Sequence, residues 1–378
     1  MKKRVGILTF FKSINNGAFL QAYSLWSLLS ERYADRAVVE LINYDSKLAV
    51  NHYTARNENS KNRENYHKFR ECLDLLSLSE GELVSDDLHE IEGYIKSLDY
   101  DVIIVGSDEV WKTDGMRGFP NAYWLNFDLG KTTRVAYAVS GRNDYQSLNT
   151  SQKAYMKEAL ERFDYIGVRD KVTENELKCM SAKAIYQNCD PTILFADRFR
   201  FDNCEIQARR KLRGLSINKK TILIILYDYQ LMKRLYRMLG GEYNIIATYD
   251  IVGDASDQDY YAQTPFEWQE LIGISDMVIT SLFHGTIFSM IHNKRFLSIE
   301  TAVQGRGKIE DLLIRCGLKD HLVYKDHFRN RGDCALGMEI FTRTRMMMND
   351  NDSISYNSIL ETESDRANSF LGKMDEYI

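Results

Sequence analysis

Short apolar runs alternate along the chain with segments whose apolar residues recur at helical spacing. Runs typical of buried strands occur at Val5–Phe10, Val102–Val105 and Arg134–Val139, while Gly17–Glu31 carries a broad apolar face of helical period. The same pattern predicts further strands at Tyr165–Val168, Ile222–Leu226, Tyr243–Ala247, Met277–Ile279 and Phe296–Ile299. Strands that alternate with helices in this way favour an α/β fold built on parallel sheets.

Two segments lack this pattern and mark the organisation of the chain. From Asn51 to Arg70 the sequence is polar and has little core-forming content, which predicts an exposed helix or loop. Residues 198–220 carry basic runs without an apolar period, so we expect a boundary between two lobes there. The prediction is an N-terminal α/β lobe over residues 1–205, a C-terminal α/β lobe over residues 206–345, and a closing helix within residues 346–378.

Composition excludes several classes of protein. The chain has 378 residues, of which 44% are hydrophobic and 27% charged, as expected for a globular protein of two lobes. A net charge of −5 does not favour general affinity for nucleic acid or anionic membranes, and no apolar run approaches the ~18 residues of a membrane span. The six cysteines lack CxxC spacing, which indicates reduced thiols in a cytoplasmic protein, with a Cys179–Cys189 disulfide as the alternative.

A His-Gly pair follows one of the buried strands. Met277–Ile279 is that strand, and apolar residues at helical spacing begin directly after Thr286. His284, Gly285 and Thr286 therefore lie at a strand-to-helix turn, where free N–H groups and the positive end of the helix dipole favour a phosphate or carboxylate. The alternative is that His284 only caps the turn.

A series of motifs is spread over most of the chain: VGILTF with INNGAFLQAYSL (residues 5–25), DVIIVGSDEVW (101–111), VAYAVSG (135–141), YIGVRD (165–170), DPTILF (190–195), TSLFHGT (280–286) and GRGKIEDLL (305–313). In these motifs and in their order the chain resembles the polysaccharide pyruvyl transferase family. The resemblance implies two Rossmann-like lobes around a cleft, similar to the GT-B glycosyltransferase fold, with the closing helix crossing back to the first lobe. It also implies transfer of pyruvate from phosphoenolpyruvate to a sugar as a cyclic ketal, most simply a 4,6-ketal of a hexose, with release of phosphate.

Polar residues at two strand ends of the first lobe are candidates for binding the acceptor sugar. At the first turn, these are Asn15, Asn16, Gly17 and Gln21. At the second turn, Ser107 and Trp111 flank Asp108, whose carboxylate can take a proton from a sugar hydroxyl while the tryptophan ring stacks on the sugar. The alternatives are turn chemistry alone for the first set and a helix N-cap for Asp108.

The donor site is expected to need cations, because phosphoenolpyruvate is a compact anion. By resemblance, Arg169 at the end of the strand Tyr165–Val168 grips the donor, unless it forms a surface pair with Asp170 or Glu174. His284 is expected to act as the acid and phosphate partner, with Gly285 and Thr286 beside it, and Asp108 as the base.

One position departs from the family pattern. Many members have an arginine two residues before the histidine, whereas this chain has Leu282. Arg306 and Lys308, on a glycine-rich turn that opens a helix, are the nearest replacement cations, with a solvated basic turn as the alternative.

The histidines and aspartates show no metal-binding spacing, so we expect metal-independent chemistry with phosphoenolpyruvate as co-substrate and no cofactor. The expected partners are phosphoenolpyruvate and a saccharide, with a lipid-diphosphate carrier as one alternative, no nucleic acid, and at most peripheral membrane contact. The protein would then lie in the cytoplasm or at the inner face of the cytoplasmic membrane. Two rival functions stay open: a glycosyltransferase that uses a nucleotide sugar, and a non-catalytic member of an envelope-polysaccharide pathway.

Overall fold

The chain forms two compact units in the computed structural model. The structure describes residues 2–56, 60–141, 145–216, 218–247, 258–259, 264–330 and 332–378. The first unit comprises Met1–Phe195 and Thr362–Ile378, and the second comprises Ala196–Glu361. The division after Phe195 lies earlier than the expected one at residue 205, and the return to the first unit, after Glu361, lies later than the expected one at residue 345.

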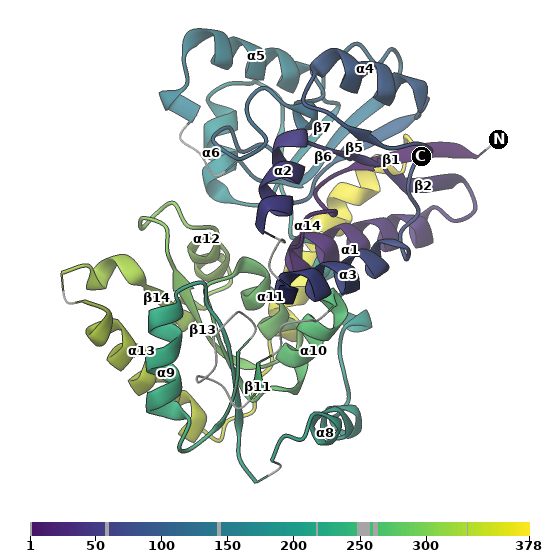
Figure 1. The fold of residues 1–378 in the computed structure, drawn as a ribbon. Helices are drawn as coiled ribbons and strands as arrows, with labels where there is room; N and C mark the ends of the chain where they lie inside the picture. Colours follow the sequence, from purple (N-terminus) through teal and green to yellow (C-terminus); the bar gives the residue numbers. More distant parts are fainter. Residues whose placement is uncertain are drawn as a thin grey trace. The chain divides into compact units, whose positions relative to one another are not determined.

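The first unit is built on a six-stranded parallel sheet with the order β2-β1-β5-β6-β7-β8 (Figure 1). Its strands are β1 (Lys3–Leu8), β2 (Ala37–Leu41), β5 (Val102–Val105), β6 (Thr133–Val139), β7 (Tyr165–Val168) and β8 (Ile185–Gln187). A separate parallel pair consists of β3 (Tyr44–Asp45) and β4 (Leu83–Val84).

Helices cover both faces of this sheet. The helices of this unit are α1 (Asn16–Arg32), α2 (Lys47–Arg56), α3 (Ser60–Leu73), α4 (Leu88–Ser97), α5 (Thr150–Glu161), α6 (Lys171–Lys178), α7 (Pro191–Leu194) and, from Thr362 on, α14 (Asn357–Met374). In Figure 1, α4 and α5 lie on one face of the sheet, and α1 and α14 on the other. Because both faces are covered, every residue of β5 is buried, as expected for a strand at the centre of a parallel sheet.

The second unit repeats this architecture with the strand order β11-β10-β9-β12-β13-β14. Its strands are β9 (Thr221–Ile225), β10 (Asn244–Ala247), β11 (Gln258–Asp259), β12 (Met277–Thr280), β13 (Arg295–Glu300) and β14 (Leu322–Tyr324). Its helices are α8 (Asn203–Leu212), α9 (Tyr229–Leu239), α10 (Pro265–Ile274), α11 (Phe283–Ile291), α12 (Lys308–Arg315) and α13 (Gly332–Asn349). Short 3-10 helices occur in both units: Ala122–Trp124 and Tyr145–Ser147 in the first, and Ala196–Arg198, Lys319–His321 and Lys325–Phe328 in the second.

Each sheet has one point at which the chain reverses its direction of strand addition. In the first sheet, β2 lies on one side of β1 and β5 on the other; in the second, β10 and β12 flank β9 in the same way. The loops that follow these strands diverge, and open α/β sheets bind their ligands in the crevice that results. The two switch points therefore identify the loops after β1 and β5, and those after β9 and β12, as the places to look for a site.

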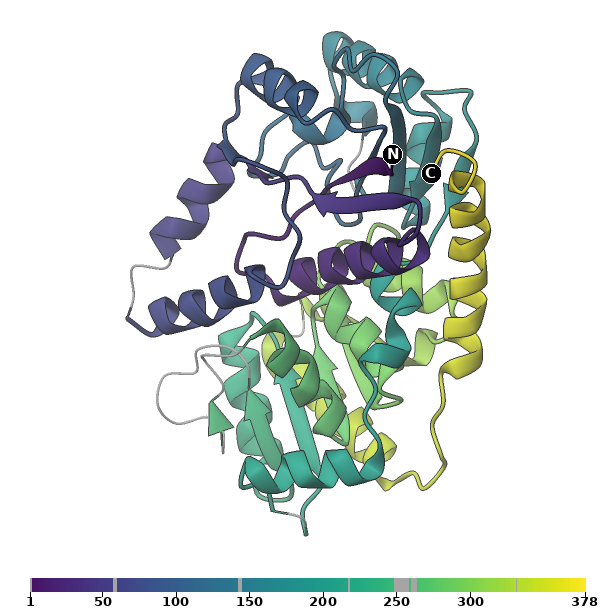
Figure 2. The ribbon, with the colours of Figure 1, turned by 90° about the vertical axis from the view of Figure 1, so that its right-hand side faces the viewer.

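Helix α14 joins the first unit through aromatic contacts. The ring of Phe370 lies 6.1 Å from that of Tyr137, 6.4 Å from Tyr165 and 5.7 Å from Tyr186. Figure 2 shows this helix (yellow) beside the teal strands of the first unit. Residues that are distant in sequence thus complete the core of the first unit.

Candidate functional site

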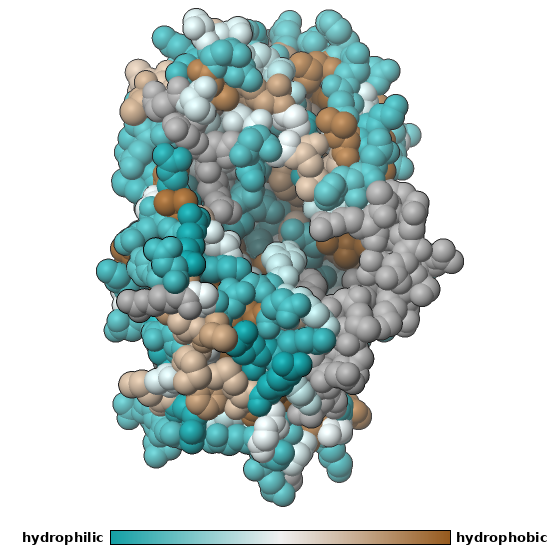
Figure 3. Space-filling view, turned by 60° about the vertical axis from the view of Figure 1, so that its left-hand side comes forward, coloured by the Kyte–Doolittle hydropathy of each residue, from teal (hydrophilic) through white to brown (hydrophobic). Residues whose placement is uncertain are grey.

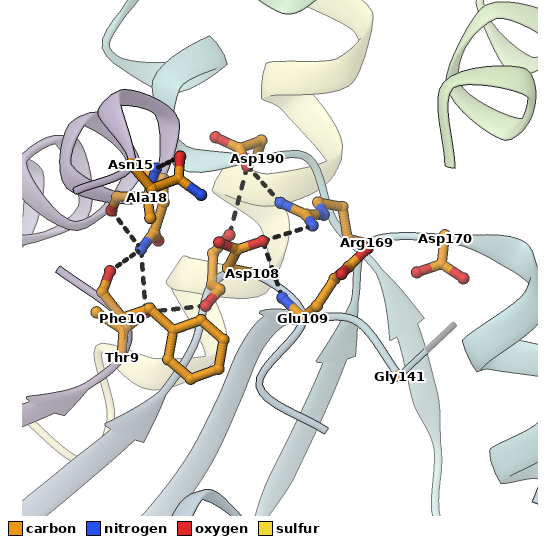
Figure 4. A network of polar contacts seen from close by, with 12 residues as sticks. Thr9, Phe10, Asn15, Ala18, Asp108, Glu109, Gly141, Arg169, Asp170 and Asp190 are labelled. Atoms are coloured by element: carbon orange, nitrogen blue, oxygen red, sulfur yellow. Dashed lines mark hydrogen bonds and ion pairs between the residues drawn. The ribbon is translucent and has the colours of Figure 1, made fainter. Parts of the chain in front are cut away.

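A buried ion-pair network occupies the carboxyl ends of β5 and β7 (Figure 4). The guanidinium of Arg169 donates from Nη1 to Asp190 Oδ2 at 2.8 Å and from Nη2 to Asp108 Oδ1 at 3.1 Å. The side chain of Arg169 is only 1% exposed. Burial alone would lower the pKa of Arg169, but the two carboxylates outweigh it, and the pKa is raised above its usual value.

This geometry does not support the expected role of Arg169 as a direct phosphate ligand. Its planar fork is already matched by two carboxylates, so it acts as a positioning residue for Asp108 and Asp190. Neither of the alternative surface pairs forms in the described structure. Asp170 caps α6 by accepting from Thr173 N at 2.8 Å, and Figure 4 shows it apart from the network, while Glu174 pairs with Lys171 and Lys178.

Asp108 lies at the edge of this network with its side chain 11% exposed. It does not cap a helix: its φ is +84°, and Oδ1 accepts from the neighbouring Glu109 N at 2.9 Å. Among the described residues, no hydrogen bond reaches Oδ2, which leaves that oxygen able to accept a substrate hydroxyl. Ser107 is fully buried, and its carbonyl accepts from Thr9 Oγ1 at 2.9 Å, so it supports the loop rather than contacting a ligand.

The first turn is held by its own side chains. Asn15 is the N-cap of α1 and accepts from Ala18 N at 3.1 Å, while Asn16 and Gly17 form the first turn of that helix. The amide nitrogen of Gln21 donates to Thr9 Oγ1 and to two backbone oxygens at 2.9–3.0 Å. Because Gln21 is fully buried, the expectation that it binds a sugar is replaced by a role in fixing the loop after β1.

Trp111 lies in the core, contrary to the expectation that it stacks on a sugar. Its ring lies parallel to that of Trp124, with centroids 4.9 Å apart, and its indole N–H donates to Tyr123 O at 2.9 Å. With no exposed surface, it has no face to offer a ligand.

In the second unit, the His-Gly turn follows β12 at the switch point. Leu282 is the N-cap of α11 and has no capping side chain, and His284 lies within the first turn, 8% exposed. Gly285 is required there because a Cβ atom would lie 2.3 Å from Thr280 Oγ1. The hydroxyl of Thr286 is buried and bonds to Ser298 Oγ at 2.7 Å, so this residue fixes the helix against β13.

Lys308 is brought next to this turn, although it is separated from it in sequence. Its Nζ lies 5.4 Å from the centre of the Phe283 ring, the residue that precedes His284. The start of α11 therefore has a cation beside it even though Leu282 stands where many relatives have arginine. Arg306 is exposed on the same glycine-rich turn.

The N-terminus of α12 is not available to an anion, which corrects the expectation for that turn. Glu300 Oε2 accepts from Glu310 N at 3.3 Å, and its Oε1 accepts from Ala302 N at 2.8 Å. Gly307 allows this carboxylate to approach, since a Cβ atom there would lie 2.0 Å from Glu300 Oε2. The anion at this helix end is thus a buried side chain of the protein itself.

Several findings bear on cofactors and surroundings. In the described part of the chain, no group of three or more His, Cys, Asp or Glu side chains is placed to hold a metal ion. The six cysteines are free thiols, so the alternative Cys179–Cys189 disulfide is not formed. No helix among the described residues is long and apolar enough to cross a membrane. On the face drawn in Figure 3, hydrophobic residues are scattered among hydrophilic ones.

The sequence itself decides the family. The family model for polysaccharide pyruvyl transferase matches residues 15–302, which include the ends of β5, β7 and β12 and the loops that follow them. The chain belongs to the polysaccharide pyruvyl transferase family. The family is one of transferases, and no curated protein matches this chain.

Solved structures show the same fold at low sequence identity. A putative UDP-N-acetylglucosamine 2-epimerase from Listeria monocytogenes is 9% identical with a TM-score of 0.63, over 100% of this chain and 97% of that one. A glycosyltransferase from Rickettsia africae is 11% identical with a TM-score of 0.56, over 98% and 99%. UDP-GlcNAc 2-epimerase from Methanocaldococcus jannaschii is 10% identical with a TM-score of 0.54, over 98% of both chains. These likenesses confirm the expected GT-B-like α/β fold.

Proposed function

We propose that this protein transfers the pyruvate of phosphoenolpyruvate to a saccharide as a cyclic ketal, with release of phosphate. The observation that carries the proposal is His284 in the first turn of α11, at the switch point of the second sheet and next to Lys308, in a chain of the pyruvyl transferase family. Phosphoenolpyruvate would be a co-substrate, and no further cofactor is needed.

The donor anion fits the start of α11. The positive end of the helix dipole and the ammonium of Lys308 both favour a phosphate or carboxylate there. Phe283 packs edge-on against His284, with ring centroids 5.6 Å apart, and this contact holds the imidazole. Gly285 and Thr286 fix the backbone that presents it, and exposed Arg306 supplies long-range positive charge.

The reaction requires one acid and one base. In this proposal His284 protonates the methylene carbon of phosphoenolpyruvate, and the enol carbon becomes electrophilic. A sugar hydroxyl adds to that carbon and gives its proton to Asp108 Oδ2. The phosphate then leaves with the C–O bonding electrons, and a second hydroxyl of the same sugar adds and loses its proton, which closes the ketal.

The substrate on the acceptor side is proposed to be a hexose of a polysaccharide or its precursor. A 4,6-ketal is the simplest product, since two hydroxyls of one ring must reach the same carbon. A precursor on a lipid diphosphate would place the reaction at the cytoplasmic face of the membrane, with only peripheral contact between protein and lipid.

The test is phosphate release from phosphoenolpyruvate in the presence of a panel of methyl hexosides, with mass spectrometry of the sugar product. A gain of roughly 70 Da per hexoside is expected for a cyclic pyruvate ketal, the mass of pyruvic acid minus water. His284→Ala should abolish both signals, and its melting temperature serves as the control for folding, because His284 is largely buried. Turnover of a nucleotide sugar instead, or near-native turnover by folded His284→Ala, would contradict the proposal.

A further inference from the structure

A second group of polar side chains lies beyond the carboxyl ends of β2, β1 and β5 in the first unit, apart from the Arg169 network. Asp45 ends β3 just beyond β2, Phe10 follows β1, and Arg117 follows β5. These loops flank the switch point of the first sheet, where ligands of open α/β sheets bind.

Aromatic rings hold these groups in place. The guanidinium carbon of Arg117 lies 3.6 Å from the centre of the Phe10 ring, and Phe10 packs edge-on against Tyr123 with centroids 4.8 Å apart. Tyr123 in turn contacts the ring of Tyr44, the residue before Asp45, at 6.0 Å. The side chains of Arg117 and Tyr123, and the backbone next to Asp45, are therefore linked by one continuous set of aromatic contacts.

Asp45 and Arg117 have hydrogen-bonding capacity that the protein does not use. Asp45 is 6% exposed, and the bond to its side chain, from Ser46 N at 2.9 Å, reaches only Oδ1. Arg117 donates from Nη2 to Ser13 Oγ at 3.3 Å, and its buried Nε has no partner among the described residues. Tyr123 is 1% exposed, and burial raises its pKa, while the charge of Arg117 and a side-chain hydrogen bond with it oppose that rise.

The Asp45 carboxylate is attracted by two nearby cations but forms no ion pair with either. The cations of Arg117 and Lys12 act on the Asp45 carboxylate, but no Arg or Lys nitrogen of the described chain lies within ion-pair distance of it. Burial raises the pKa of Asp45, and the nearby cations oppose that shift. Because this largely buried carboxylate and this guanidinium do not pair with each other, a ligand group that both donates and accepts can bond to both.

We propose that Asp45, Arg117 and Tyr123 form a slot that binds a pair of neighbouring hydroxyls of a neutral sugar ring. One hydroxyl donates to Asp45 Oδ2, and oxygen atoms of the pair accept from Arg117 and Tyr123. The carboxylates of Asp45 and nearby Asp86 balance the cations Arg117 and Lys12, so the slot has no excess positive charge that would favour an anionic sugar. This inference rests on the proposed function, in which it assigns the residues that hold the acceptor, while Asp108 takes the reacting proton.

The test measures binding of the methyl pyranosides of glucose, galactose and mannose to the full chain. Binding is detected by saturation-transfer NMR in the absence of phosphoenolpyruvate. Asp45→Asn should weaken binding about ten-fold or more, because it removes a charge-assisted hydrogen bond, and Tyr123→Phe should weaken it several-fold. The matched control is Tyr155→Phe, which removes another buried phenol hydroxyl, one that lies on α5, outside the slot.

Thermal stability provides the second readout. Because burial raises the pKa of Asp45, its charged form is disfavoured in the folded protein, and Asp45→Asn should leave the melting temperature unchanged or raise it. A carboxylate with a purely structural role would instead lower the melting temperature when replaced.

Three outcomes decide between the slot and the proposed function. Unchanged hexoside affinity in folded Asp45→Asn and Tyr123→Phe would overturn the slot, and so would the absence of hexoside binding to the unmodified protein. Loss of hexoside binding in these variants of a protein that releases no phosphate from phosphoenolpyruvate would support the slot and reject the proposed function.

Discussion

Replacement of Arg169 by methionine separates its structural role from a role in donor binding. Methionine keeps most of the volume but removes the guanidinium that neutralises Asp108 and Asp190. The side chain of Asp190 is fully buried and would lose its ion pair with Arg169. Breaking a buried pair in this way costs about 3–5 kcal/mol, so the first unit should melt about 6–20 °C lower, at about 2–4 °C per kcal/mol for its size.

Tryptophan fluorescence can report the unfolding of the first unit. Three of the four, Trp26, Trp111 and Trp124, belong to the first unit, and only Trp268 belongs to the second. In a Trp268→Phe background, tryptophan fluorescence during urea unfolding therefore reports on the first unit alone.

Two further variants test the cause of the effect. Arg169→Lys should recover part of the loss, since an ammonium can reach one carboxylate but cannot bridge both. Adding Asp190→Asn to Arg169→Met should also recover part of it, because the stranded charge is removed. The reasoning would be refuted if Arg169→Met unfolded at the wild-type urea concentration and only raised the Michaelis constant for phosphoenolpyruvate. The guanidinium would then be available to a ligand after all.

Three other predictions concern the second unit and its turn. Burial lowers the pKa of His292 to about 3, so below pH 6.5 the unfolded chain binds a proton there that the folded chain does not, and this residue should lower the free energy of unfolding by about 2 kcal/mol between pH 6.5 and pH 5. His292→Gln should remove this part of the pH dependence in urea titrations and exposed His89→Gln should not, while a further part should remain because burial also lowers the pKa of His321. Gly285→Ala should destabilise the protein by about 1–3 kcal/mol in the same assay, with partial recovery by Thr280→Ala, and purely additive effects would contradict a clash between the new methyl group and Thr280. Lys308→Met should raise the Michaelis constant for phosphoenolpyruvate about ten-fold with little change in kcat, and a constant that stays at its wild-type value would remove Lys308 from the donor site.

The backbone of the fold could be predicted because its signals are local. The strands Val102–Val105 and Tyr165–Val168 were expected with the bounds that the structure has, since buried strands are short apolar runs between polar turns. The strand β2 (Ala37–Leu41) was not expected, because its alternation of buried and exposed residues is weak over so few positions. The polar stretch from Asn51 to Arg70, for which an exposed helix or loop was expected, consists largely of parts of two helices, α2 and α3, and their low apolar content explains why their number and bounds were not predicted.

The side chains at the strand ends were predictable in position but not in role. Trp111 is in the core because its ring stacks on that of Trp124, and no local sequence pattern predicts this contact. The partners of Arg169 are Asp108 and Asp190, which follow other strands, so only the order of strands in the sheet brings them together. Asp45 was missed for the same reason: it is one aspartate among many until the loops after β1 and β5 surround it.

The return of the chain to its first unit has a consequence for synthesis on the ribosome. Residues Thr362–Ile378 complete the core around Phe370, but the whole of Ala196–Glu361 must be translated before they appear. At the usual speed of elongation this takes roughly 10–30 s, during which the rings of Tyr137, Tyr165 and Tyr186 lack their contacts with Phe370. The nascent chain therefore leaves this part of the core uncovered and accessible to chaperones throughout that interval, and a transcript cut short after the second unit yields a protein without these contacts.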